Sequence, residues 1–356
     1  MIYLIDTIGN ETGMHLYDIT FVEKCAKEKV QVSIISNFSD ERTCLRLHNY
    51  YHGNIIRRFF FLFIDWWKLL YFRFSHQHSF FIYQSFGLRF LDIIFFIIFS
   101  FNNNTYLLVH DIYELTPTSA KDKRINLKKI IYRLFVKKYI CHSRRVEAEL
   151  KEICLGYKKK YIYYPHFDYT FSTSFDESKI CNEVINLVDN KKINLLFFGQ
   201  ISLTKGVDIL LQAYDKIDER FNIIIAGLDK GNLLQKYRDN SRLRIINRYI
   251  LDDELNFLFS KVQIVLLPYK EIFQSGVLET VVHFKKIAVL SSVPSFEEFL
   301  YKYPSFGVNY SPNTPEELAE CINGLSLNEL CYSEADVEKY VKDHDIKILI
   351  DNLFYK

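Results

Sequence analysis

The stretch VQIVLLPYKEIFQSGVLETVVHFKKIAVLSS, Val262–Ser292, decides the fold. It holds two apolar runs, Ile264–Leu267 and Ile287–Leu290, which predict buried strands. Between them a polar loop leads into a segment that we expect to become helical near Ser275. A strand, a short loop, a helix and a second strand in this order are typical of a parallel sheet with helices on both faces.

The same alternation fills the rest of the second half. The apolar runs Lys192–Gly199, Phe221–Gly227 and Arg242–Asn247 predict further strands. In Lys205–Ile217 apolar residues recur at helical spacing, and Asp252–Ser260 opens with carboxylates, which favour a helix N-terminus. The second half is therefore predicted to form one doubly wound domain.

The first half shows this alternation less cleanly. Strands are expected at Ile2–Asp6, Val30–Ile35, Phe80–Tyr83, Thr105–Val109, Tyr139–Cys141 and Tyr161–Tyr164. Helices are expected at Met14–Lys27, Gly87–Phe99, Leu127–Val136 and Ser143–Ile153. The polar stretch Phe167–Asn190 is interpreted as a linker, and the tail Glu334–Tyr355 as one or two helices.

Together these elements predict an α/β protein with two Rossmann-like, doubly wound domains that face a central cleft. The expected domains are residues 1–168 and 182–335, with a C-terminal helix at about 336–356 that packs back on the first. In such sheets the ligand lies at the carboxyl ends of the strands. Functional residues are therefore expected in the loops that follow the strands.

Composition excludes several classes of protein. Of 356 residues, 49% are hydrophobic and 25% charged, which favours large folded cores over disorder. A net charge of +2 does not require a nucleic-acid partner. The seven cysteines form no CxxC pair, so neither a disulfide framework nor a zinc site is expected. Because Met1 begins no signal-peptide pattern and the longest apolar run, Ile93–Phe101, cannot span a bilayer, we expect a cytoplasmic protein.

The loop inside the opening stretch has the features of a phosphate site. Ser275, Gly276 and Val277 would place several helix N-terminal N–H groups, which attract anions, at the sheet edge. Glu279 lies about one turn inside the helix, and Glu271 lies on the loop before it. Carboxylates there can accept hydrogen bonds from sugar hydroxyls, which favours a sugar nucleotide. Isolated glutamates are usually surface charges, but this placement raises the functional interpretation above that one.

A lysine in another strand-to-helix loop supports the same ligand. Lys205 and Gly206 stand at an expected helix start, after the strand that ends at Gly199. A cation at a helix N-terminus opposes the helix dipole, and a polyphosphate between the two removes that conflict. We therefore expect Lys205 to contact a diphosphate, although most single lysines are only solvated.

These motifs resemble those of the retaining glycosyltransferases of the GT-B fold, the large group-one family. The resemblance rests on FFGQISLTKGVDILLQAY, FNIIIAG, RYILDDEL and the seven-residue gap between Glu271 and Glu279. It is strong over Lys192–Phe299 and weaker over the first half. It implies that the C-terminal domain binds a nucleotide sugar, that the anomeric configuration is retained, and that no metal is required.

The resemblance also implies roles for single residues. Lys205 would hold the diphosphate, Glu279 would bond the ribose, and Glu271 would meet the donor hexose. The base-contacting stretch of the family matches Arg248, Tyr249 and Ile250.

Two departures from the family pattern concern the phosphates. Gln200 follows the strand-ending Gly199, where the family commonly has arginine, and it stays a candidate donor contact. The family's Glu-Gly-Phe-Gly is replaced by Glu-Ile-Phe-Gln at 271–274, and the glycine lies at Gly276. These changes bear on which N–H groups contact the phosphates.

The first half offers further candidates. In the family a glycine loop after the first strand approaches the donor diphosphate, and GNETGMH here makes Gly13 the candidate. His110 ends a strand in LLVHD, where the family often has a histidine near the reacting centre, although a lone histidine is more often structural. We expect Ser143 to cap a helix, and regard His142 and His166 as weaker site candidates.

The segment RRFFFLFIDWWKLLYFRF, Arg57–Phe74, leaves two interpretations open. Its polar residues Arg58, Asp65 and Lys68 fall near one helical face, and the others are aromatic or aliphatic. It could be a core helix packed around its two tryptophans. It could equally be a basic, aromatic helix that lies in a membrane interface.

The sequence thus predicts a hexosyltransferase that uses a nucleoside diphosphate sugar and a glycan or lipid-linked acceptor, in surface polysaccharide or glycolipid synthesis. Glu271, His110 and Lys205 are the expected catalytic residues. No cofactor, metal ion or nucleic acid is expected, and the protein would be cytoplasmic or peripheral at the inner face of the membrane. A hydrolysing epimerase and a non-catalytic scaffold stay open. A dinucleotide oxidoreductase is disfavoured because no G-x-G-x-x-G follows either first strand.

Overall fold

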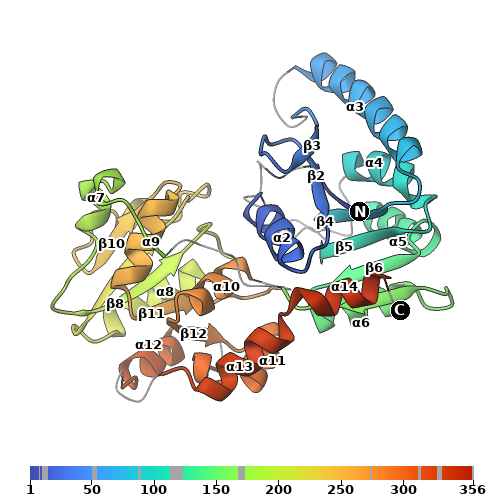
Figure 1. The fold of residues 1–356 in the computed structure, drawn as a ribbon. Helices are drawn as coiled ribbons and strands as arrows, with labels where there is room; N and C mark the ends of the chain where they lie inside the picture. Colours follow the sequence, from blue (N-terminus) through green and yellow to red (C-terminus); the bar gives the residue numbers. More distant parts are fainter. Residues whose placement is uncertain are drawn as a thin grey trace. The chain divides into compact units, whose positions relative to one another are not determined.

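The computed structural model describes residues 1–7, 9, 15–49, 54–86, 90–112, 123–166, 173–272, 275–311, 314–326 and 331–354. The chain forms two compact units (Figure 1). Unit 1 is Met1–Phe167 with His344–Lys356, and unit 2 is Asp168–Asp343. Each unit is built on one parallel sheet, which confirms the predicted pair of doubly wound α/β domains. The chain returns to unit 1 at His344, later than the boundary near residue 336 that the sequence suggests.

The sheet of unit 1 has the strand order β3-β2-β1-β4-β5-β6-β7. Its strands are β1 (Ile2–Asp6), β2 (Val32–Ser36), β3 (Thr43–Arg46), β4 (Phe80–Phe86), β5 (Thr105–Asp111), β6 (Lys138–Cys141) and β7 (Lys160–Tyr163). The sequence did not predict β3, because this edge strand alternates between exposed and half-buried residues and carries no apolar run. Strands β1, β2, β4, β5 and β6 are mostly buried on both faces, which their apolar runs reflect, whereas the edge strand β7 is half-buried.

Helices cover both faces of this sheet. They are α2 (His15–Lys27), α3 (Ile55–Ser75), α4 (Phe90–Ser100), α5 (Lys123–Leu134), α6 (Arg144–Ile153) and α14 (Ile346–Phe354). The connection through α2 runs in one direction along the sheet and those through α3 to α6 in the other, so right-handed crossovers put them on opposite faces. The Ser143 hydroxyl accepts from the N–H groups of Arg145 and Val146, which confirms its predicted capping role.

The C-terminal segment is held in unit 1 by specific contacts. The Tyr164 hydroxyl donates to the carbonyl of His344 at 2.8 Å, and the Lys160 ammonium donates to the carbonyl of Asn352 at 3.0 Å. Helix α14 also packs against α2. Because the preceding helix belongs to unit 2, the tail predicted as one or two helices is two helices, one in each unit.

Unit 2 has the strand order β10-β9-β8-β11-β12-β13. Its strands are β8 (Ile193–Phe198), β9 (Phe221–Ala226), β10 (Leu243–Ile246), β11 (Ile264–Leu267), β12 (Ile287–Ser291) and β13 (Gly307–Tyr310). Successive residues of β8 pack into different apolar clusters, since Leu195 and Phe197 join one and Leu196 joins the other. Strand β13 was not predicted, because this short edge strand contains a glycine and an exposed asparagine and so has no apolar run.

The helices of unit 2 follow the predicted alternation. They are α7 (Asn182–Ile185), α8 (Val207–Ala213), α9 (Asp252–Lys261), α10 (Gly276–His283), α11 (Pro294–Lys302), α12 (Pro315–Asn323) and α13 (Glu334–Asp343). The interpretation of Phe167–Asn190 as a linker is wrong for its second part. Ile180, Val184 and Leu187 are buried in an apolar cluster of unit 2. These apolar residues are few and are separated by polar residues, so the sequence pattern did not indicate that they are buried.

Helix α3 turns its aromatic side outward. It runs along the outside of unit 1 (Figure 1), and its buried residues are Leu62, Asp65 and Leu69. Its exposed large apolar residues are Ile55, Ile56, Phe59, Phe60, Phe63, Trp67, Tyr71 and Phe74. The Trp67 side chain is 52% exposed, so the interpretation of this segment as a helix packed around its tryptophans is wrong. In the described part of the chain no helix is long and apolar enough to cross a membrane.

Candidate functional site

Two strand-end glycines open the carboxyl edge of the sheet in unit 2. Gly199 and Gly227 follow β8 and β9 with φ angles of 108° and 153°, which disfavour any side chain. A Cβ on Gly227 would lie 1.7 Å from the carbonyl oxygen of Gly199. A Cβ on Gly199 would lie 3.4 Å from Cγ2 of Val277, so the first turn of α10 lies beside this edge. The adjoining Gln200 is exposed.

The loop before α8 is locked to the loop after β11. Gly206 has a φ of 70°, and a Cβ there would lie 1.7 Å from the carbonyl oxygen of Pro268. The N–H of Lys270 donates to the carbonyl of Thr204 at 2.9 Å. Lys205, which precedes this glycine, places its ammonium 4.0 Å from the ring centroid of Tyr269. The lysine predicted to hold a diphosphate is therefore held at the loop after β11.

The buried Tyr269 brings this lysine and the start of α10 together. Its ring lies under the Lys205 ammonium, and its hydroxyl lies near the side chain of Ser275 without forming a hydrogen bond of normal geometry. Burial raises the pKa of Tyr269 well above its usual range, so the ring stays neutral. Ser275 caps α10, since its Oγ accepts from the N–H of Leu278 at 3.1 Å. A cation and a helix N-terminus at one sheet edge can bind an anion.

The two predicted glutamates lie in different surroundings. Glu271 is exposed on the loop after β11. Glu279 is only 7% exposed, and its carboxylate accepts a hydrogen bond from the hydroxyl of Tyr340 in α13. Burial first, and the Glu279 carboxylate second, raise the pKa of Tyr332. Tyr340 was not predicted as a site residue, because it lies 61 residues beyond its partner in the sequence.

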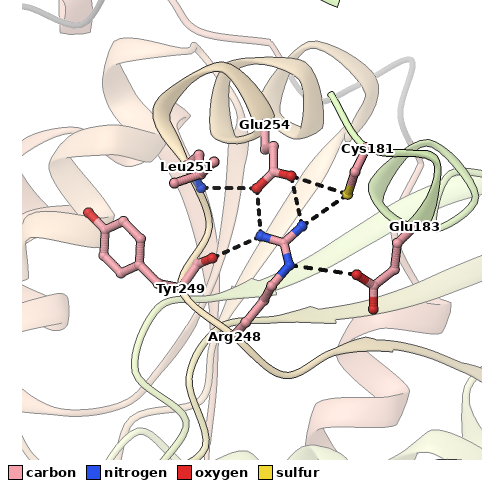
Figure 2. A network of polar contacts seen from close by, with 6 residues as sticks. All are labelled: Cys181, Glu183, Arg248, Tyr249, Leu251 and Glu254. Carbon is pink, nitrogen blue, oxygen red and sulfur yellow. Dashed lines mark hydrogen bonds and ion pairs between the residues drawn. The ribbon is translucent and has the colours of Figure 1, made fainter. Parts of the chain in front are cut away.

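The predicted base-contacting stretch is fixed by a buried carboxylate. Figure 2 shows the Arg248 guanidinium on Glu254, with both nitrogen–oxygen distances at 2.7 Å. Arg248 also donates to the carbonyl of Tyr249 at 2.9 Å and contacts the sulfur of Cys181 at 3.0 Å. The second oxygen of Glu254 accepts from the N–H of Leu251 at 3.1 Å. These bonds fix the course of the loop before α9.

This pairing decides what the stretch presents to solvent. Hydrogen bonds from Arg248 hold the pKa of Glu254 down, at about 2, so the carboxylate is charged at neutral pH. The guanidinium is therefore engaged inside the loop, Ile250 is buried, and the Tyr249 side chain is 61% exposed. An exposed aromatic ring on a rigid loop can stack on a flat ligand.

A row of buried polar side chains follows the carboxyl ends of adjacent strands in unit 1. In sheet order from β1 to β7 these are Asp6, Gln84, His110, His142 and His166. Tyr17 of α2 packs against all three histidine rings, at centroid distances of 5.2, 5.5 and 5.2 Å. Gly13, the other candidate of this unit, lies outside the described residues.

The histidines of this row are kept neutral. His110 is 1% exposed, and burial, followed by the neighbouring His142 and His166, lowers its pKa well below the usual range. Burial lowers the pKa of His142 to about 4. Among the described residues, no three His, Cys, Asp or Glu side chains are grouped to hold a metal ion.

Comparison with known proteins finds a family match for one segment of the chain. Residues 192–328 match the family model for glycosyl transferases group 1. This segment lies in unit 2, which is therefore similar to glycosyl transferases group 1. An uncharacterized glycosyltransferase of Methanocaldococcus jannaschii is 27% identical over 194 residues, which cover 52% of this chain. The match spans 49% of that relative, about half its length.

Solved structures resemble the chain over nearly its whole length. Sucrose-phosphate synthase from Thermosynechococcus elongatus has a TM-score of 0.68 at 14% identity, with 98% of this chain and 94% of that chain covered. A glycosyltransferase from Rickettsia africae has a TM-score of 0.69 at 15% identity, with 100% and 98% covered. Anabaena HepE in complex with UDP and glucose has a TM-score of 0.65 at 14% identity, with 99% and 95% covered. These similarities show the fold, which is GT-B.

Proposed function

We propose that this protein is a retaining glycosyltransferase that moves a hexose from a nucleoside diphosphate sugar to a hydroxyl group. One observation carries the proposal. Lys205 and the N-terminus of α10 both lie beside Tyr269, at the carboxyl edge of the sheet and inside the segment that matches the family. Negative charge grows on the diphosphate as the sugar leaves, and a fixed cation with helix N–H groups stabilises it.

The other candidates take roles around that diphosphate. Glu279 bonds the ribose, Glu271 orients the hexose, and His110 acts near the reacting centre. The base lies against the loop before α9, where Tyr249 offers an exposed ring. That the related fold of HepE was solved with UDP-glucose supports testing UDP-sugars first. The remaining donor contacts proposed are Gly13, Gln200, Arg248, Ile250, Ser275, Gly276 and Val277.

A thermal-shift panel of UDP-, GDP- and dTDP-sugars tests this function. A ligand at about a hundred times its dissociation constant adds about 2.7 kcal/mol of stability, which gives a clear shift. We expect one donor class to stabilise the protein and Lys205→Ala to remove most of that shift. Lys191→Ala is the matched control, because this exposed lysine precedes β8 at the opposite end of the strand.

Two outcomes would contradict the proposal. No stabilisation by any nucleotide sugar would favour a non-catalytic scaffold. Release of nucleotide together with an epimerised free sugar, in the absence of an acceptor, would favour a hydrolysing epimerase.

We also propose that α3 attaches the enzyme to an anionic membrane surface on the cytoplasmic side, where it would meet a lipid-linked acceptor. The exposed aromatic stripe of α3 supports this location. Its charges fit as well, since Arg57, Arg58, Lys68 and Arg73 accompany a single acidic residue, Asp65, that is buried and paired. Each basic residue near an anionic surface contributes about 1 kcal/mol.

A further inference from the structure

We infer that Gln84 and Asp18 are positioning residues that fix His110 in one neutral tautomer, with its proton on Nε2. The inference rests on the proposed function only in that His110 serves the sugar transfer. Its structural part follows from a chain of hydrogen bonds across α2, β4 and β5. Each bond in this chain determines the direction of the next.

The chain starts at two carboxyl groups. Asp6 at the end of β1 and Asp18 in α2 are fully buried, and their carboxyl groups lie close enough to interact electrostatically. Two buried carboxylates in contact cannot both be ionised, so the pair retains a proton. Burial, and then the charge of Asp6, raise the pKa of Asp18 well above its usual range. Oδ1 of Asp18 is the oxygen that faces Gln84 and acts as an acceptor.

The amide of Gln84 links the Asp18 carboxyl group to the His110 ring. Its amide nitrogen donates to Oδ1 of Asp18, so its amide oxygen faces the opposite way. That oxygen lies 2.9 Å from Nε2 of His110. An amide oxygen can only accept, so Nε2 of His110 must carry the hydrogen. The lone pair of the neutral imidazole is then on Nδ1.

The neighbouring His142 is fixed in the opposite tautomer. Its Nδ1 lies 2.8 Å from the carbonyl oxygen of Tyr164, which can only accept, so the hydrogen is on Nδ1. Its Nε2 therefore accepts from the hydroxyl of Tyr17 at 2.8 Å. The rings of His110 and His142 are 5.4 Å apart, and two different partners set their tautomers. His142 thus serves as an internal reference.

A fixed neutral tautomer suits the proposed reaction. Positive charge develops on the sugar ring as its bond to the leaving group breaks, and a nearby imidazolium would oppose it. A neutral His110 with its lone pair on Nδ1 can instead accept a hydrogen bond from a sugar hydroxyl. If the amide of Gln84 could turn, the proton would move to Nδ1 and this acceptor would be lost. Gln84 and Asp18 therefore act through His110.

Nitrogen-15 NMR of the full chain with labelled histidine, recorded without donor, tests the tautomers directly. We expect His110 to carry its proton on Nε2 and His142 on Nδ1 between about pH 5 and 8. Gln84→Met and Asp18→Leu remove successive steps of the chain at similar side-chain size. Both should mix the tautomers of His110 and leave that of His142 unchanged. Tyr17→Phe is the matched control, because it removes the partner of His142 and leaves the Gln84 contact in place.

Kinetics with the donor found by thermal shift then separate positioning from simple structure. Gln84→Met and Asp18→Leu should lower kcat about tenfold and leave KM nearly unchanged. A wild-type His110 that is charged at neutral pH, or protonated on Nδ1, overturns the inference. So does an altered tautomer with an unchanged kcat. A wild-type enzyme that turns over no donor refutes the proposed function instead, and the NMR result still decides the tautomer.

Discussion

At the scale of single residues, Tyr340 holds the carboxylate that we assign to the ribose. Its hydroxyl donates a hydrogen bond to the carboxylate of Glu279, and Glu279 is buried in unit 2. Hydrogen bonds to charged groups contribute about 1.5–3 kcal/mol, so losing this one lets the carboxylate turn. We expect Tyr340→Phe to weaken nucleotide binding about three- to tenfold by calorimetry. Tyr301→Phe, an exposed tyrosine of the same unit, should change nothing.

The two glutamates should differ in kinetics. Glu279→Gln should weaken nucleotide binding, whereas Glu271→Gln should mainly slow transfer because we place it at the hexose. Wild-type affinity and turnover in both variants would show that their spacing is a coincidence.

Glu254 makes the stability of unit 2 dependent on pH. Its pKa falls from 4.5 to about 2 on folding, chiefly through hydrogen bonds from Arg248. A depressed pKa gives stability that is present above 4.5 and is lost as pH falls through about 2. Glu254→Gln should therefore lower the free energy of unfolding by about 2 kcal/mol at pH 7. Denaturant titrations should show the difference shrinking between pH 4.5 and about 2.

The control for this effect lies in the same network. Glu183 contacts Arg248 at 3.6 Å from an exposed position (Figure 2), so Glu183→Gln should cost less than about 1 kcal/mol. Equal losses of unfolding free energy in Glu183→Gln and Glu254→Gln would mean that the buried ion pair stabilises the unit no more than the exposed one.

At the scale of elements, α3 tests the membrane proposal. Phe63→Ser with Trp67→Ser should reduce co-sedimentation with anionic liposomes and leave thermal stability nearly unchanged, because both side chains are exposed. Leu69→Ala should cost about 2–5 kcal/mol, because this residue is buried. Wild-type binding should fall as salt rises. A wild-type protein that ignores anionic liposomes at low salt would refute the proposal.

The orientation of α3 also shows where sequence patterns mislead. Its polar residues fall near one helical face in the sequence, yet Asp65 is fully buried, with its carboxylate 2.9 Å from Nδ1 of His48 and 3.0 Å from Lys68. An aspartate on one side of a helix predicts that this side is exposed to solvent, unless a residue of another element pairs with the carboxylate and allows its burial. Here that residue is His48, which lies outside the helix and therefore does not appear in the helical periodicity of the sequence.

At the scale of the molecule, the parts that could be predicted are those encoded locally. Strands buried on both faces carry apolar runs, and the Lys205 and Ser275 motifs follow such strands directly in sequence. The edge strands β3 and β13 lack such runs and were missed. Contacts such as Asp18 with Gln84, 66 residues apart, arise only when the sheet assembles its strands.

Metal dependence is a property of the whole reaction, and we predict none. The negative charge that grows on the leaving diphosphate would be stabilised by Lys205 and the N–H groups of α10. In metal-dependent enzymes a divalent cation provides this stabilisation. Turnover should therefore be the same with EDTA as with magnesium or manganese. Lys205→Ala should lose turnover in either buffer. Activity that disappears on chelation and returns with metal would show that the diphosphate needs an ion, and that Lys205 is not sufficient to replace it.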